Sequence, residues 1–307
     1  MSLDPTSPHW YRRAPDRWSY ACSTWAFLRL LGAIYFIAFC SLGVQVRGLI
    51  GGRGILPAAE LLAAARRVAE PYGLGLVNYL RLPTLCWIDA SDATLVSMCV
   101  AGALLSLLLT AGIGSAVVLP VLWLLYLSLA TVSGEFLSFQ WDTLLLETGL
   151  VAMAVAPWTL VHRPGKGDPP PLSRWLLWWL LFRLMFAAGL VKLASGDPLW
   201  SGLTALAVHY ETQPIPTPIG WYAHHLPAWF HTASTATVLG VELTVPWLIF
   251  APRRLRHAAC AVLMALQLLI ALTGNYTFFN LLTVALAGFG HQRVAVAQVD
   301  NRVHRRI

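Results

Sequence analysis

Apolar stretches of about membrane-spanning length recur along the chain and alternate with polar segments. A run of about 20 apolar residues crosses the hydrocarbon core of a bilayer. We therefore predict an all-α fold, a polytopic transmembrane helical bundle with about eight spans. The last expected span is short and follows its neighbour across the tight turn Gly274-Asn275, so the count is least certain over 257–290. The expected spans lie near 22–45, 93–112, 114–134, 143–161, 175–194, 233–251, 257–274 and 276–290.

Polar segments frame and interrupt this membrane domain. Residues 1–21 are polar and 291–307 form a basic tail, which leaves 22–290 as the membrane domain. No cleavage-type signal precedes the first apolar run, so we expect that run to remain as a signal anchor. Two long loops, 46–92 and 195–232, connect spans. The first contains an expected interfacial helix with Arg66 and Arg67 on its polar side, and the second is rich in interfacial aromatic residues.

The composition supports a membrane protein. The chain is 57% hydrophobic and 11% charged, whereas soluble domains carry about 25% charged residues. The net charge is +7, but the basic residues occur in short clusters between apolar runs. That pattern orients a membrane protein and does not suggest a nucleic-acid partner, so membrane lipids are the expected surroundings. The abundance of Arg, Ala, Leu and Trp indicates a GC-rich bacterial genome, hence a bacterial cell membrane.

The distribution of Arg and Lys predicts the orientation. With eight spans and an inner N-terminus, thirteen basic residues fall on the inner side. Five fall on the outer side, all in the loop 46–92. Because basic residues favour the cytoplasmic side, we expect both termini inside and both long loops outside. One span fewer would reverse the C-terminus.

Ionisable residues inside spans are costly, so each is a candidate functional residue. Those in this chain are Arg29, Glu147, Arg183, Lys192 and Glu242, with Asp142 at a span boundary. The alternative is structural, because acids and bases on different helices can pair and fix a bundle. We expect Arg29, Arg183 and Glu242 to be structural, with Arg183 paired to Glu242.

The most polar stretch of the expected spans is FLSFQWDTLLLETG, residues 136–149. On a helix, Gln140, Thr143 and Glu147 share one face, while Ser138 and Asp142 share another. Arg183 and Lys192 are nine residues apart, which places them on opposite helix faces and about 13 Å apart in depth.

Most of these polar residues are expected near the outer leaflet, which predicts an outward-facing polar cavity. A desolvated Lys192 there can act as a base, or it can neutralise Glu147. No metal site is expected, because the chain has no CxxC or HExxH spacing and metal needs convergent ligands. The predicted polar cluster comprises Gln140, Asp142, Glu147, Lys192, His209, Glu211, Asn275 and Asn280.

Four stretches resemble the lipase maturation factor family. They are LRLLGAIYFIAFCSLGVQVRGLIGGRGILPA (28–58), FLSFQWDTLLLETG (136–149), GLVKLASGDPLWSGLTALAVHYETQPIPTP (189–218) and GNYTFFNLLT (274–283). The resemblance covers roughly residues 25–290. It implies an integral membrane protein whose animal relatives lie in the endoplasmic reticulum membrane and help dimeric lipases to fold. Those relatives usually carry a soluble domain after the spans, whereas 17 residues follow Gly290 in this chain.

A more distant likeness is to the membrane part of vitamin K-dependent gamma-carboxylases. In that family a lysine in a G-x-x-K-L context acts as a base on the quinol, and Gly189–Leu193 has this form. The likeness implies a base role for Lys192 alone.

Two functions therefore remain open. The first is a maturation factor, without a cofactor, that assists a secreted client such as a lipase. The second is an enzyme that acts on a quinone-like or lipid substrate, with Lys192 and Glu147 as catalytic residues. A Lys192 that lines a lipid-sized cavity favours the enzyme, and a Lys192 closed in an ion pair disfavours it.

Overall fold

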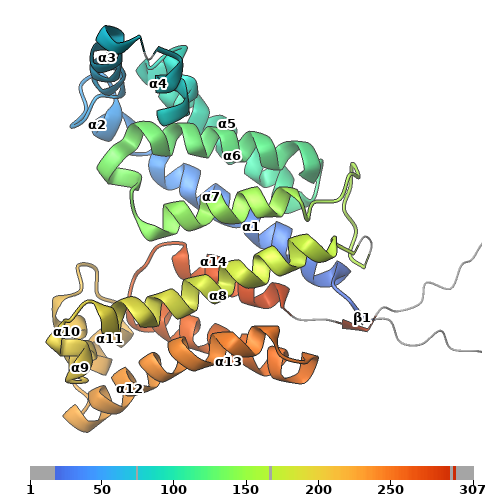
Figure 1. The fold of residues 1–307 in the computed structure, drawn as a ribbon, viewed down its shortest axis with the longest axis vertical. Helices are drawn as coiled ribbons and strands as arrows, with labels where there is room; N and C mark the ends of the chain where they lie inside the picture. The colour runs from blue at the N-terminus through green and yellow to red at the C-terminus, as the bar shows by residue number, and fades with distance from the viewer. Residues whose placement is uncertain (1–17, 74, 166–167, 291–292, 295–307) are drawn as a thin grey trace, which may run out of the picture.

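The structure is a computed structural model that describes residues 18–73, 75–165, 168–290 and 293–294. It confirms the predicted all-helical bundle, to which the described residues add one pair of two-residue strands (Figure 1). Six helical segments among these residues are long and apolar enough to cross a membrane. They are α1 (Ala21–Gly43), α5 (Asp92–Ala111), α6 with its 3-10 extension (Ser115–Leu137), α8 (Pro171–Ala194), α12 with its extension (Ala228–Phe250) and α13 (Arg253–Thr273).

Two shorter helices complete the bundle at the places of the fourth and eighth expected spans. They are α7 (Gln140–Met153) and α14 (Phe279–Phe289). At about 1.5 Å per residue, neither reaches the roughly 30 Å of a hydrocarbon core. The expected bounds 143–161 were wrong for α7, which begins and ends earlier. Pro157 follows the helix closely, and the backbone before a proline disfavours the α conformation.

The first transmembrane helix, α1, packs along α5 and also contacts α14, α6 and α7. The approach to α5 is close because two glycines face larger side chains. A Cβ on Gly102 would lie 2.4 Å from the Phe39 ring, and one on Gly32 would lie 2.6 Å from Thr110 Oγ1. Small residues allow such backbone contact between membrane helices. Beside this contact Tyr35 and Phe39 stack in the core, and Tyr126 meets both rings edge-to-face.

The connections separate into two ends of the bundle. The turn at 112–114 and residues 154–165 meet at one end, where Ile113 pairs with Val161. The strands β1 (Trp18–Ser19) and β2 (Arg293–Val294) lie at this end too. The short helices of both long loops lie at the opposite end (Figure 1), called here the loop end. They are α2 (Val46–Ile50), α3 (Ala58–Ala69), α4 (Gly75–Arg81), α9 (Pro198–Ser201), α10 (Ala205–Thr212) and α11 (Pro218–His224).

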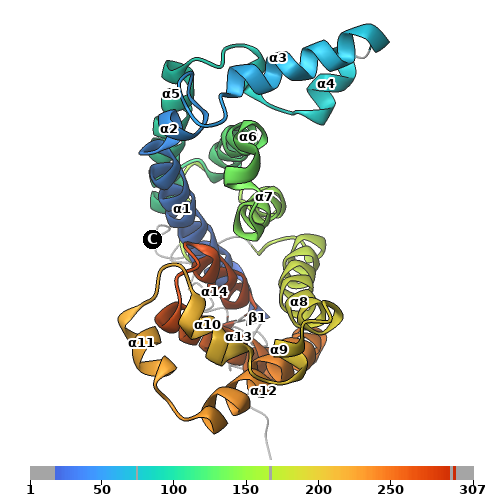
Figure 2. The same cartoon turned by 90° about the vertical axis from the view of Figure 1, so that its left-hand side faces the viewer.

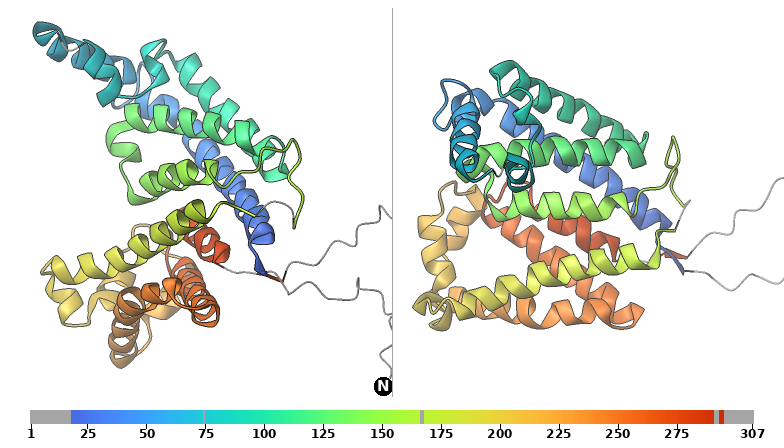
Figure 3. Two further views of the ribbon diagram at one scale, coloured as in Figure 1. Left: turned by 45° about the vertical axis from the view of Figure 1, so that its right-hand side comes forward. Right: turned by 45° about the horizontal axis from the view of Figure 1, so that its top comes forward.

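The figures also show how the loop helices stand on the bundle. From two further viewpoints the spans remain roughly side by side, with α3 and α4 above and α9–α11 below (Figure 3). The two long loops therefore gather at the end that the sequence analysis assigns to the outside of the membrane.

Candidate functional site

A closed ion pair joins α8 to α12. Lys192 Nζ lies 2.5 Å from each carboxylate oxygen of Glu242. The Lys192 side chain is 23% exposed and that of Glu242 only 5%. The ammonium also lies 5.1 Å from the centroid of the Trp200 ring, which covers it from the loop end. Both carboxylate oxygens and one aromatic face therefore engage Lys192.

A second ion pair joins α7 to α8, in which Arg183 Nη2 donates to Glu147 Oε2. The side chains of Arg183 and Glu147 are 48% and 37% exposed on the protein surface, so this pair lies at the edge of the bundle. The face that carries Glu147 also carries the exposed residues Gln140 and Thr143. This stripe of α7 therefore points out of the bundle.

The expected pairing of Arg183 with Glu242 was wrong, and so was that of Lys192 with Glu147. The first half of α12 packs against the loop helix α10, where Thr235 Oγ1 accepts from the Leu206 backbone at 3.4 Å. Glu242, in the second half of α12, is thereby level with Lys192 near the end of α8. Arg183 lies more than two turns deeper, where α7 offers Glu147.

Asp142 lies in the first turn of α7 and points into the core. Its Oδ1 accepts a hydrogen bond from Tyr126 Oη at 2.5 Å, and the residue is 1% exposed. An acid in the first turn is stabilised by the helix dipole and by unpaired backbone N–H groups. Ser138 precedes the helix, so the expected shared helix face of Ser138 and Asp142 was wrong. The sequence carried no signal for Tyr126, because it lies in a Leu-rich span.

The remaining members of the predicted polar cluster lie in α10, in α14 and in the turn between α13 and α14. Tyr276 Oη and His209 Nε2 lie 3.1 Å apart, and Asn280 Nδ2 donates to the Gln267 backbone oxygen at 3.0 Å. Asn275 Oδ1 accepts from the Thr277 backbone at 3.2 Å and closes the turn before α14. Glu211 is exposed. Burial lowers the pKa of His209.

Arg29 lies at the end opposite the loop end. Its guanidinium donates to the His162 backbone oxygen at 2.6 Å and lies over the Trp25 ring. It joins α1 to the segment after α7 at this end of the bundle. The structural role expected for Arg29 stays a prediction.

Two cavities open at the loop end, and neither is lined by Lys192 or Glu147. One of about 500 Å³ lies between α3 and residues 86–90. The other, of about 250 Å³, is lined by residues of α10–α12 that include His224 and His231. Within the described part of the chain, no three His, Cys, Asp or Glu side chains lie close enough to hold a metal ion. Neither of these two cavities is lined by a member of the predicted polar cluster. The outward polar cavity stays a prediction.

Comparisons with known proteins identify relatives over nearly the whole described bundle. The family model of the lipase maturation factor transmembrane domain matches residues 22–292. Lipase maturation factor 2 of Gallus gallus is 47% identical over 272 residues, which cover 85% of this chain and 37% of that protein. The Homo sapiens protein of the same name is 46% identical over 278 residues, 85% of this chain and 38% of that protein.

A second group of relatives is more distant. Lipase maturation factor 1 of Mus musculus is 36% identical over 263 residues, which cover 84% of this chain and 45% of that protein. The chain thus spans less than half the length of these curated relatives. No solved structure matches the chain. The likeness to gamma-carboxylases stays a prediction that these matches do not test.

Proposed function

Because the chain belongs to the lipase maturation factor family, we propose that it assists the folding of a secreted client, such as a lipase, at a membrane surface. It is an integral membrane protein whose long loops gather at one end of the bundle. In our proposal this loop end faces away from the cytoplasm, both termini lie inside, and the membrane is the bacterial cell membrane. A secreted client would then meet the loops as it emerges.

The observation that carries the proposal is an exposed aromatic surface on a braced loop. Trp221, Tyr222 and Trp229 are all more than half exposed on α11 and the start of α12. The segment before them is bound to the end of α13. Thr217 Oγ1 donates to the Leu272 backbone oxygen at 2.6 Å, and Gln213 Nε2 donates to that of Thr273 at 3.2 Å. Rigid aromatic side chains bind partners at a low entropic cost, and contiguous exposed apolar side chains mark interaction surfaces.

The geometry favours this function over the enzyme. A lysine acts as a base only when it is free to take a proton from substrate, whereas Lys192 bonds both oxygens of a buried glutamate and is covered by Trp200. Neither described cavity at the loop end reaches Lys192. These two cavities therefore do not place a quinone-like substrate beside it.

The test is co-expression with a dimeric secreted lipase in a host without other maturation factors. We measure lipase activity per amount of secreted lipase. The proposal predicts that the chain raises this ratio and that Trp221→Ser/Trp229→Ser lowers the gain at least threefold. Trp158→Ser is the matched control, because Trp158 is also an exposed tryptophan but follows α7 at the opposite end.

An unchanged gain with Trp221→Ser/Trp229→Ser, at normal membrane level, would refute the role of the aromatic surface. The absence of any gain across several lipases would refute a lipase client. The level of each variant in the membrane fraction separates these outcomes from loss of the protein.

A further inference from the structure

The helix α3 lies across the transmembrane spans at the loop end. In Figure 1 the viewer looks nearly along the axis of α3, whereas α5 and α6 are seen from the side. In Figure 2 α3 is seen from the side, whereas α5 and α6 are seen nearly along their axes. The Asn78 side chain on α4 donates to the Ala65 backbone oxygen at 2.9 Å and holds the two helices together. A helix perpendicular to the spans at one end of the bundle lies in the plane of the membrane surface.

Apolar side chains around α3 and α4 are exposed in the protein. Leu80 and Ile88 are 82% and 86% exposed, and Val68 and Tyr72 are exposed as well. Such a set of large apolar side chains is unfavourable in water and stable in the boundary between headgroups and acyl chains. The helix pair is therefore partly immersed in the leaflet at the loop end.

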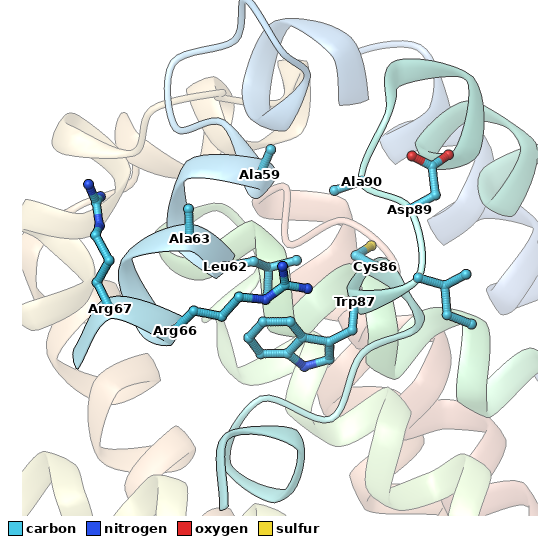
Figure 4. Close-up of a pocket in the computed structure, with 10 residues that line it drawn as sticks. Ala59, Leu62, Ala63, Arg66, Arg67, Cys86, Trp87, Asp89 and Ala90 are labelled. Atoms are coloured by element: carbon cyan, nitrogen blue, oxygen red, sulfur yellow. The ribbon is translucent and has the colours of Figure 1, made fainter. Parts of the chain in front are cut away.

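A cavity of about 500 Å³ opens between α3 and the segment before α5. This volume lies within the range of small-molecule sites. Its apolar lining includes Leu62, Ala63 and Trp87, and buried Cys86 forms part of the lining (Figure 4). Trp87 Nε1 donates to the Leu82 backbone oxygen at 2.8 Å, which fixes the indole ring. The cavity is thus preformed and mostly apolar.

Arg66 supplies a positive charge inside this cavity. Its guanidinium carbon lies 5.2 Å from the centroid of the Trp87 ring, and Figure 4 shows the side chain reaching toward that ring. Within the described residues its N–H groups donate no hydrogen bond, so they are available to an acceptor. Arg67 also lines the cavity but extends in another direction (Figure 4).

The nearby carboxylate does not neutralise Arg66. Asp89 lines the cavity but accepts bonds from Ser91 N at 3.0 Å, from Ser91 Oγ at 2.6 Å and from Thr94 Oγ1. These bonds lower the pKa of Asp89 and commit its carboxylate to the cap of α5. Figure 4 shows it pointing away from Arg66. The cavity therefore presents cationic donors beside apolar walls at a membrane surface.

We propose that this cavity binds the headgroup of an anionic phospholipid in the leaflet at the loop end. The Arg66 guanidinium donates to phosphate oxygens, for which its planar fork is suited. Arg67 adds positive potential without direct contact. The acyl chains lie along exposed apolar side chains such as Leu80 and Ile88. The site ties the outward loop to the membrane surface.

The test measures thermal unfolding of the purified, full-length chain in zwitterionic nanodiscs as phosphatidylglycerol replaces phosphatidylcholine. We expect phosphatidylglycerol to raise Tm with a saturable dependence. Arg66→Gln should weaken the apparent affinity about tenfold, and Arg67→Gln less. Arg53→Gln is the matched control, an exposed arginine of the same loop that does not line the cavity. Inorganic phosphate forms a separate arm.

Three results would overturn the proposal. The first is an unchanged affinity in Arg66→Gln. The second is an equal loss in Arg53→Gln, which would indicate attraction by overall charge. The third is an equal Tm rise with inorganic phosphate alone, which would indicate a free anion as the ligand. If Arg66→Gln does not fold, Arg66→Lys keeps the charge, and the site then predicts an affinity loss of about threefold from the missing fork.

Discussion

The two basic residues in the membrane part of α8 each meet a glutamate of a different helix. Arg183 binds Glu147 of α7, and Lys192 binds Glu242 of α12. Their nine-residue spacing already predicts opposite faces of α8. The partners were mispredicted, because sequence spacing does not give the depth of α12 relative to α8. That depth depends on how the loop helix α10 packs against the start of α12.

The Lys192–Glu242 ion pair should stabilise the packing of α8 against α12. Lys192→Met leaves a buried carboxylate without a partner, so we expect a loss of about 3–5 kcal/mol in unfolding free energy. Lys192→Met/Glu242→Leu removes both charges, and we expect it to recover most of that loss. The measurement is a double-mutant cycle by denaturation in micelles. If the loss of unfolding free energy in the double variant equals the sum of the losses in the two single variants, the residues do not interact, which would contradict a stabilising ion pair.

His209 should make stability dependent on pH. Burial lowers its pKa below the value of about 6.5 for a free histidine. As pH falls below about 6.5, the unfolded chain takes up a proton that the folded protein resists, so the free energy of unfolding decreases. We expect His209→Gln to flatten the stability profile between pH 6.5 and 5. An unchanged slope in His209→Gln would show that other groups cause it.

At the scale of elements, the apolar pattern predicts the helices well and their ends less well. All eight expected spans correspond to helices, but α7 ends at Met153 where the sequence analysis expected 161. The residues after it are apolar, so hydropathy alone extends the span, whereas Pro157 limits the helix. The acid Asp142 was placed at a boundary, and it does stand in the first turn of α7. Its contact with Tyr126 depends on the packing of α6 and α7, which spacing does not encode.

The close contact between α1 and α5 gives an element-scale prediction. Gly102→Ala places a Cβ 2.4 Å from the Phe39 ring, so we expect a loss of about 1–3 kcal/mol in unfolding free energy. Gly240→Ala is the control, because no atom lies within 4 Å of its Cβ position. The control should be neutral or stabilising by up to about 1 kcal/mol. Equal effects in thermal unfolding would argue against the contact.

At the scale of the molecule, the two long loops lie at the same end of the bundle although about 100 residues separate them in the chain. The alternation of spans predicts that arrangement. The sequence does not predict the two surfaces at this end, the α3 cavity and the exposed aromatic surface. Each of them combines residues from separate segments of the chain. The resemblance to the family, carried by motifs such as 136–149, is confirmed by the match over residues 22–292.

The orientation itself is testable by labelling. In a variant that lacks the five cysteines, Glu211→Cys at the loop end should react with a membrane-impermeant maleimide on intact cells. Arg163→Cys, at the opposite end, should react only after permeabilisation. Both positions are exposed in the protein. The reverse pattern would place the loops in the cytoplasm and exclude contact with a secreted client.

The central claim is that the intramembrane charges hold the bundle together while the loop end serves the client. Its most direct test measures lipase activity per amount of secreted lipase with Lys192→Met/Glu242→Leu and with wild type. The two proteins are compared at equal amounts in the membrane and at equal thermal stability. We predict that this variant, which has no base at position 192, retains at least half of the wild-type gain. A stable, membrane-inserted variant with no gain would contradict the account and assign chemistry to Lys192.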